Sequence, residues 1–356
     1  MIEPMNALVT GGAGYIGSHA ALRLLRDGHK VVILDNLYRG HQAAVDAVRT
    51  AAGDKGANLS FVKADIGDTD LITDVVRTHR IDTVLHFAAL AYVGESVQQP
   101  VRYYDNNTGR ASNLLRGLDA AGTVRRMVFS STCATYGEPG PSDVPIRETL
   151  LQRPINPYGA SKLFFERVLI DYTAAARSAG RPFGVAMLRY FNVAGCDSSG
   201  LLGEHHDPES HIIPVILQCL LGVRPGGQNT LTVFGTDYPT PDGSCIRDYV
   251  HVEDLVDAHV RAIAALQAGE VRTYNVGVGK GYSVKEVIAA AEKVTGKQVA
   301  VRFGDRRPGD PATLFADPTK IRTELGWSPK HTTIETSVAT AWEWFRKNPH
   351  GYPASR

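Results

Sequence analysis

Ala7-Leu8-Val9-Thr10, followed by Gly11-Gly12-Ala13-Gly14-Tyr15-Ile16-Gly17, is the stretch that decides the fold. The first four residues predict a buried strand, and residues 18–25 continue with the pattern of a helix. A strand, a glycine-rich turn and a helix in this order are typical of a dinucleotide-binding unit. The glycines let the backbone approach a pyrophosphate, and the start of the helix offers free N–H groups and the positive end of its dipole.

Five further apolar runs have the character of strands and are separated by helical stretches. They lie at residues 31–35, 59–65, 83–89, 127–131 and 184–191. Apolar strands with helical crossovers indicate a parallel sheet that is covered on both faces. We therefore predict an α/β fold with a Rossmann-type, doubly wound parallel sheet, which binds ligands at the carboxyl ends of its strands.

The composition changes after about residue 192. Glycine, proline and histidine cluster in residues 195–214, and glycine and proline again in residues 235–243, and short helices are expected at residues 284–294 and 318–325. We predict a dinucleotide-binding domain over residues 1–192 and a smaller α/β substrate-binding lobe over residues 193–356, from which late segments can return to the first domain.

The bulk composition excludes several classes of partner. The chain has 356 residues, 43% of them hydrophobic, and a net charge of +1, so no electrostatic argument favours nucleic acid or an anionic membrane surface. No apolar run approaches the roughly 18–20 residues that span a bilayer. The glycine motif begins too early for a signal peptide to precede it, and the four cysteines are scattered, so we expect a cytoplasmic protein with reduced cysteines.

Asp35 ends the second predicted strand, 18 residues after Gly17. A carboxylate at this place accepts hydrogen bonds from the adenine ribose and repels a 2′-phosphate, which favours NAD over NADP. Arg39 is the nearby residue that would instead favour NADP, because its charge could bind the 2′-phosphate. The plainer interpretation of Asp35 is a residue of the turn that follows the strand. Asp65 ends the third predicted strand, where it is placed to hold the adenine amino group.

Tyr158 and Lys162 lie four residues apart, one helical turn, and follow the hydroxyls of Ser130-Ser131-Thr132 at the end of the fifth predicted strand. Such a pair alone is usually a solvated helix face. A free tyrosine has a pKa of about 10, and Lys162 together with a positive nicotinamide ring would lower the pKa of Tyr158 toward that of a general base. Combined with the glycine motif, the pair predicts redox chemistry at an alcohol.

Eight blocks of the chain resemble the extended short-chain dehydrogenase/reductase family and, within it, the UDP-galactose (UDP-glucose) 4-epimerases. The blocks are residues 11–17, 34–36, 93–96, 103–107, 158–162, 188–192, 247–249 and 307–310. The resemblance implies a tightly bound NAD, a homodimer that pairs helices near residues 101–121 and 158–176, and a UDP-sugar substrate. Tyr158 would deprotonate the sugar 4-hydroxyl while hydride passes to NAD, and the 4-keto sugar would then turn its other face and be reduced.

The same resemblance implies the roles of individual residues. The catalytic residues would be Thr132, Tyr158 and Lys162. The NAD contacts would be Gly11, Gly14, Tyr15, Ile16, Gly17, Asp35, Asn36, Asp65, Ile66, Phe87, Ala88, Ala89, Asn106, Ser130, Tyr158, Lys162 and Phe191. The substrate contacts would be Thr132, Asn192, His211, Ile212, Thr232, Val233, Phe234, Arg247, Arg307, Asp310 and Leu314.

Several alternatives stay open. The segments 89–96 and 131–137 also resemble UDP-arabinose 4-epimerases, which act on UDP-xylose, and Leu314 in place of a bulkier residue leaves room for the 2-acetamido group of UDP-N-acetylglucosamine. A 4,6-dehydratase needs an acidic residue after Thr132, where the chain has Cys133-Ala134-Thr135. A non-catalytic NAD sensor would be expected to lack Tyr158. The spacing of the histidine-rich loop 203–211 fits no standard zinc site, so no metal ligand is assigned.

Overall fold

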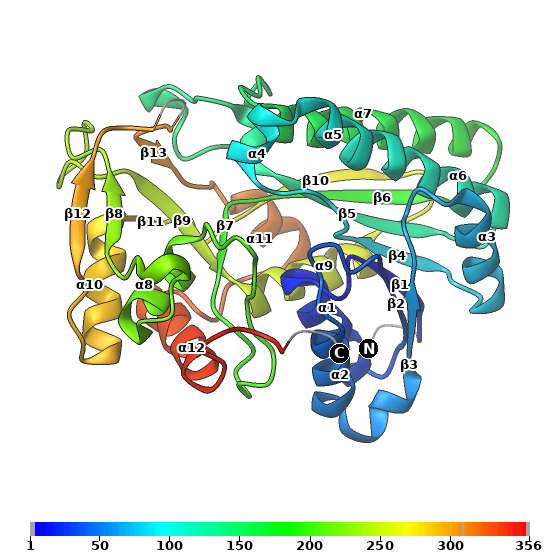
Figure 1. Cartoon of the computed structure of the whole chain (residues 1–356). Helices are drawn as coiled ribbons and strands as arrows, with labels where there is room; N and C mark the ends of the chain where they lie inside the picture. The colour runs from blue at the N-terminus through cyan, green and yellow to red at the C-terminus, as the bar shows by residue number, and fades with distance from the viewer. Residues whose placement is uncertain (1–3, 308–309, 354–356) are drawn as a thin grey trace.

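The computed structural model describes residues 4–307 and 310–353. Seven parallel strands form one sheet in the order β10-β6-β5-β4-β1-β2-β3 (Figure 1). Their bounds are β1 (Asn6–Thr10), β2 (Lys30–Asp35), β3 (Leu59–Lys63), β4 (Thr83–His86), β5 (Arg126–Thr132), β6 (Gly184–Tyr190) and β10 (Val271–Val276). The chain reverses its direction of winding between β1 and β4, so a ligand crevice is expected where these two strands end.

Helices cover both faces of the sheet, as the apolar strands predict. One face packs against α3 (Thr69–Thr78), α6 (Ala111–Ala121) and α7 (Pro157–Ser178), and the other against α1 (Tyr15–Arg26), α2 (Gln42–Ala51) and α9 (Val252–Ala265) (Figure 1). Each face has its own core of buried aliphatic side chains. The Rossmann-type fold class is therefore confirmed.

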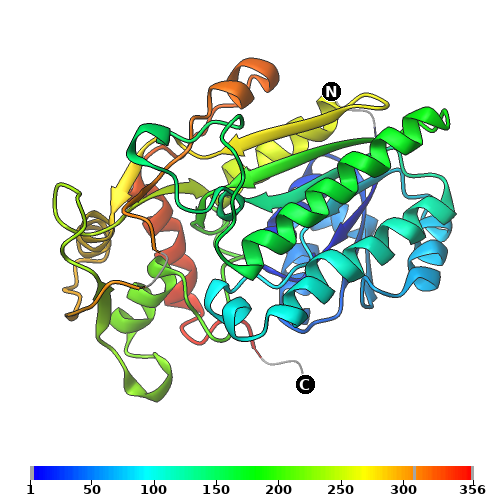
Figure 2. The ribbon, with the colours of Figure 1, turned by 90° about the horizontal axis from the view of Figure 1, so that it is seen from above.

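A smaller α/β lobe lies beside the carboxyl ends of the strands (Figures 1 and 2). It contains β7 (Asn192–Ala194), β8 (Leu231–Phe234), β9 (Ile246–His251), β11 (Gly281–Ser283), β12 (Val301–Gly304) and β13 (Thr313–Leu314), together with α8 (Ile212–Leu221), α10 (Val284–Thr295) and α12 (Ile334–Lys347). These helices share a third core with β8 and β9. The chain thus leaves the first sheet after β6 and returns to it with α9 and β10.

The structure corrects some predicted boundaries. The fourth strand ends at His86 instead of residue 89, because the backbone leaves the sheet after Phe87 donates its N–H to the Thr10 carbonyl. The third ends at Lys63. The helices expected near residues 101–121 are α5 (Pro100–Tyr104) and α6, which flank a π-helical turn, Asp105–Arg110, and α4 (Val93–Gln98) precedes them. The helix expected at residues 318–325 is α11 (Thr319–Leu325). Within residues 4–307 and 310–353, no helix has both the length and the apolar character to cross a membrane.

Candidate active site

The glycine turn is closed by backbone contacts that exclude side chains. Gly11 has a φ of +70°, and a Cβ there would lie 2.6 Å from the Ala88 nitrogen. A Cβ on Gly17 would lie 2.2 Å from the Gly11 carbonyl oxygen. The first glycine therefore permits the turn against the loop after β4, and the last permits close packing of α1 on the turn.

Gly14 is different, because the protein does not fill the space beside it. The nearest atom to a Cβ at Gly14 would be the Gly11 carbonyl oxygen, at 3.3 Å. Gly14 is the N-cap of α1 and makes no side-chain cap, and the first turn, with Tyr15 and Ile16, carries no acidic residue. The free N–H groups of this helix start are thus available to an anion such as a pyrophosphate.

The predicted adenosine contacts gather at the ends of β2 and β3. Asp35 accepts hydrogen bonds from the N–H groups of Ala13 (3.1 Å) and Leu37 (2.8 Å), and burial raises its pKa above the usual value. The Asn36 amide donates to Asp65 at 3.0 Å. The Asp65 carboxylate also pairs with Arg110 at 2.8 Å.

Although partial burial raises the pKa of Asp65, hydrogen bonds from Gly67 and Asn36 and the charge of Arg110 lower it overall. The neighbouring Ile66 is buried. Arg39, the residue that argued for NADP, pairs with Glu95 at 3.2 Å and also donates to the Asp207 carbonyl.

The loop that follows β4 borders the glycine turn. Phe87 packs its ring against His259, with 4.9 Å between ring centroids, and Ala88 and Ala89 continue the loop. Asn106 lies in the π-helical turn and donates to the side chain of Asn107 at 3.0 Å. Asn107 was not singled out from the sequence, yet it fixes this loop through hydrogen bonds with both the N–H and the carbonyl of Leu90.

Helix α7 brings the predicted catalytic pair under the end of β5. Asn156 caps the helix by accepting from the Gly159 N–H at 2.9 Å, and the i, i+4 spacing turns Tyr158 and Lys162 toward the sheet, where both are buried. The Lys162 ammonium donates to the Ser130 carbonyl at 2.8 Å. Burial lowers the pKa of Lys162 to about 7, although Glu166 opposes this shift.

The pKa of Tyr158 differs from the sequence-based expectation. Burial and the neighbouring Tyr190 raise it above the usual value, and a hydrogen bond with Thr132 lowers it. Lys162 makes its hydrogen bond to Ser130 rather than to the phenol. A hydroxyl so buried needs a further positive charge close to it before it acts as a base near neutral pH.

A buried ionic network behind this pair was missed from the sequence. Ser131 donates to Glu166, which also pairs with Arg189 through N–O distances of 2.6 and 3.0 Å. Arg189 donates in turn to the Tyr136 hydroxyl at 2.9 Å. Glu166 lies one further helical turn beyond Lys162, and this continued spacing is the signal that could have identified it.

In the smaller lobe, the structure joins several predicted substrate contacts. Arg247 is buried and pairs with Asp310, and the parallel register of β13 with β9 places Leu314 opposite Arg247. Leu314 also packs into the hydrophobic cluster that contains Phe191. Arg307 stacks its guanidinium 3.9 Å from the ring centroid of Phe234.

The remaining predicted contacts separate into two sets. On β8, Val233 points into the core of the lobe, whereas the Thr232 hydroxyl accepts from Arg302 at 2.7 Å. Asn192, His211 and Ile212 line one small cavity. Two residues of the 307–310 block, Pro308 and Gly309, lie outside the described residues.

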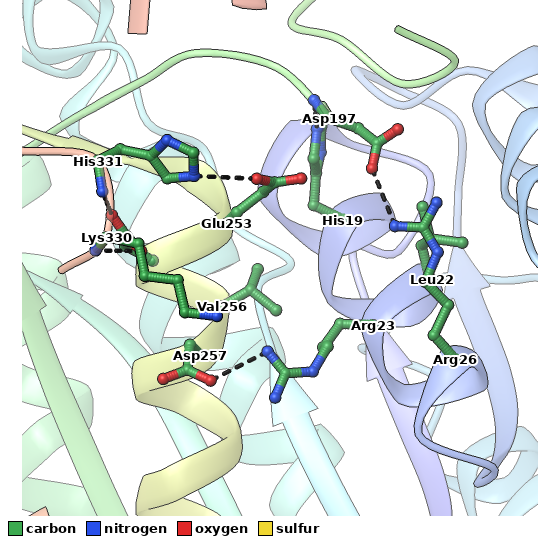
Figure 3. A pocket seen from close by; sticks show the side chains of 11 residues that line it. His19, Leu22, Arg23, Arg26, Asp197, Glu253, Val256, Asp257, Lys330 and His331 are labelled. Atoms are coloured by element: carbon green, nitrogen blue, oxygen red, sulfur yellow. Dashed lines mark hydrogen bonds and ion pairs between the residues drawn. The ribbon is translucent and has the colours of Figure 1, made fainter. Parts of the chain in front are cut away.

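A larger cavity, of about 220 Å³, lies elsewhere, between α1 and α9 (Figure 3). Both of its arginines are paired with aspartates: Arg23 with Asp257 at 3.0 Å, and Arg26 with Asp197 at 3.1 Å. None of the predicted site residues lines it. We therefore do not assign this cavity as the active site, although it is the larger of these two cavities.

Comparison with known proteins identifies the family of the chain. The profile of the GDP-mannose 4,6-dehydratase family matches residues 8–340. A UDP-glucose 4-epimerase of Halalkalibacterium halodurans is 46% identical over 98% of this chain and 98% of its own, and a probable UDP-arabinose 4-epimerase of Oryza sativa subsp. japonica is 46% identical over 98% and 84%. The crystal structure of a UDP-glucose-4-epimerase from Stenotrophomonas maltophila, with bound NAD and formylated UDP-arabinopyranose, is similar with a TM-score of 0.89 at 41% identity, covering 97% of this chain and 99% of that one. The chain therefore belongs to the extended short-chain dehydrogenases/reductases and, within them, to the family of the UDP-glucose 4-epimerases.

Proposed function

We propose that this protein interconverts UDP-galactose and UDP-glucose by inverting the sugar at carbon 4, with NAD as a tightly bound cofactor. One observation carries the proposal: Tyr158 and Lys162 lie buried below the end of β5, beside the Thr132 hydroxyl. They adjoin the switch point of the sheet, where the glycine turn leaves its helix start open.

NAD fits the residues at this switch point. The open side of Gly14 and the uncapped start of α1 suit a pyrophosphate, and the buried Asp35 carboxylate suits the ribose hydroxyls. Gly11, Tyr15, Ile16 and the other cofactor contacts expected from the sequence belong to this proposal. When bound, NAD supplies the hydride acceptor and a positively charged ring.

The chain's own residues supply proton transfer and positioning. Tyr158 takes the proton of the sugar 4-hydroxyl, and Thr132 orients that oxygen. Lys162, one helical turn beyond Tyr158, is held by its hydrogen bond to the Ser130 carbonyl at 2.8 Å, and we assign it the positioning of the cofactor and of the phenol. Arg247 and Arg307 hold the diphosphate by charge-assisted hydrogen bonds, so that the sugar can present either face without leaving.

The substrate is tested with purified protein and no added cofactor. UDP-galactose and UDP-xylose are incubated separately, and the nucleotide sugars are then separated. Formation of UDP-glucose supports the proposal. UDP-arabinose as the sole product would move the assignment to the pentose branch, to which the rice relative and the Stenotrophomonas maltophila ligand give weight. If neither UDP-galactose nor UDP-xylose gives a product, even with NAD added, the proposal is overturned.

The same assay with UDP-N-acetylglucosamine tests the space beside Leu314. Leu314 is only half-buried, against the cluster that holds Phe191. Epimerisation of this substrate would show that the pocket accepts a 2-acetamido group. Its complete rejection would remove that part of the substrate range and leave the hexose assignment untouched.

The protein is further proposed to form a homodimer through α4, α5 and α7. Val97, Val101 and Phe164 on these helices are 62, 79 and 49% exposed, an apolar surface that association would cover. Val101→Glu should give a monomer in light scattering, whereas Val271→Glu, at an exposed position on β10, should not. A monomeric wild type would refute the dimer. The cytoplasmic location remains a prediction.

A further inference from the structure

The loop between β7 and α8 brings together two histidines and two glutamates, which we call the His–Glu cluster: Glu204, His206, Glu209 and His211. The Nδ1 atom of His206 lies 3.3 Å from Glu204 and 3.5 Å from Glu209. The Nδ1 atom of His211 lies 2.8 Å from Glu204 and 3.3 Å from Glu209. Each of the four residues thus offers one ligand atom, and these four atoms lie within 4.8 Å of one another.

These atoms are close but do not satisfy one another. One oxygen of each glutamate and both Nδ1 atoms are buried without a hydrogen-bond partner among the described residues. The side chains of Glu204 and Glu209 are only 3 and 4% exposed. A buried carboxylate oxygen without a hydrogen-bond partner is costly, so the two unpartnered oxygens favour a ligand at the centre of the cluster.

A second histidine–glutamate group in the same molecule shows the contrast. His251 accepts from the Glu253 N–H at 3.2 Å with one ring nitrogen and meets the Thr340 hydroxyl at 3.0 Å with the other. His331 meets Glu253 at 3.2 Å. This second group is explained by its own hydrogen bonds, whereas the His–Glu cluster is not.

We propose that the His–Glu cluster binds one divalent cation of the zinc type. In a tetrahedral zinc site with bonds of about 2.0–2.1 Å, neighbouring ligand atoms lie about 3.3 Å apart. The separations of 2.8, 3.3 and 3.5 Å that join the two Nδ1 atoms to the unpartnered glutamate oxygens scatter around this value. Two imidazoles and two carboxylates suit zinc better than magnesium, which prefers oxygen ligands. The other oxygen of Glu209 accepts from the N–H groups of Ser210 and His211, both at 2.8 Å, and so orients the carboxylate.

The position of the cluster indicates a structural role. Four protein ligands close the coordination sphere, as in structural zinc sites. The His206 ring lies edge-on to Tyr15 at the start of α1 and to Tyr92, with 6.2 Å between centroids in each case. His211 directly precedes α8. The cation would fasten the smaller lobe onto the glycine turn, and the 44% exposure of His211 leaves it a route from solvent.

The competing explanation is an ion-pair cluster without metal. Two imidazolium groups would then neutralise the two glutamates. Burial alone would lower the pKa of His211, but the neighbouring Glu204 and Glu209 outweigh it and raise this pKa to about 10. Such a cluster would be insensitive to chelators and to added zinc. Metal content therefore separates the two explanations, whichever sugar the enzyme uses.

The experiment uses the full-length protein treated with a chelator, dialysed, and then given Zn²⁺ or Mg²⁺. We expect about one zinc per chain by elemental analysis and a melting temperature that rises by roughly 5 °C with Zn²⁺ but not with Mg²⁺. His206→Gln and Glu209→Gln should each weaken zinc binding at least tenfold. His205→Gln is the matched control, because His205 is adjacent but stacks on His41 at 4.3 Å instead.

Three results would overturn the proposal. They are a wild type that retains no zinc above background, a melting temperature unaffected by chelator and zinc, or zinc retained equally by His206→Gln and the wild type. If the variants fail to fold, the chelation and zinc addition on the wild type still decide the question.

Discussion

The two halves of the proposed active site, the cofactor side and the sugar-nucleotide side, are built differently. On the cofactor side, backbone contacts fix the geometry: Gly11 presses against Ala88, and the Ala13 N–H holds Asp35. On the side proposed to bind the sugar nucleotide, charged side chains contact other side chains: Arg247 pairs with Asp310, and Arg307 lies over the ring of Phe234.

The difference is what we expect of a site that holds one ligand firmly and lets another turn. A site formed by backbone costs little to organise when a ligand enters. A site made of paired side chains must exchange those partners for the ligand. An epimerase needs both properties, because its cofactor stays while the sugar presents two faces in turn.

The largest effect is expected where the two halves meet. Tyr158→Phe should reduce kcat by about 10²–10⁴-fold, since it removes the proposed general base, and leave NAD content and UDP affinity unchanged. Tyr172→Phe, on the same helix, is the control. Turnover near that of the wild type would refute the role of Tyr158, and loss of NAD would show that the two halves are not separable here.

Removal of the Asp35 carboxylate tests the cofactor side alone. Asp35→Ala should weaken NAD retention by about 10–100-fold, the cost of lost charged hydrogen bonds, while UDP affinity stays constant. Asp46→Ala, at an exposed position on α2, is the control. NAD content after gel filtration is the measurement, and unchanged retention would mean that the ribose contact lies elsewhere.

The pH dependence of stability tests how strongly Lys162, on the cofactor side, is desolvated. Its pKa is lowered by burial from 10.5 to about 7, so between these pH values the unfolded chain holds a proton that the folded protein has released. Stability contributed by this group therefore rises with pH. From pH 7 to 9, wild type free of NAD should gain on the order of 2 kcal/mol relative to Lys162→Met in denaturant melts. A constant difference would contradict the lowered pKa.

The smallest effect is expected on the sugar-nucleotide side. Asp310→Asn releases Arg247 from its ion pair but also removes a proposed ribose contact, so UDP affinity should change by about tenfold or less. Arg247→Ala should weaken UDP binding more. Calorimetry with UDP measures both. A greater loss with Asp310→Asn would show that the aspartate binds ligand more than it restrains the arginine.

Sequence patterns predicted those parts of the fold and of the candidate site that are set by residues close together in the chain. The glycine turn, the apolar strands and the i, i+4 pair of Tyr158 and Lys162 each follow from residues close together in the chain. The pairing of Glu166 with Arg189 joins α7 to β6, and the register of Leu314 against Arg247 joins two distant strands. Such contacts depend on tertiary packing, which periodicity does not describe. The His–Glu cluster, by contrast, lies within a single loop, and it was not assigned from the sequence because its spacing resembles no standard metal motif.

The late return of β10 to the first sheet has a consequence for fragments and for folding. A fragment that stops at residue 192 would expose the edge of β6 that β10 pairs in the full chain. Open strand edges promote association with other chains. During synthesis, too, the sheet cannot be completed until Val276 has been made, so we expect the nascent first domain to need shielding for longer than its own length implies.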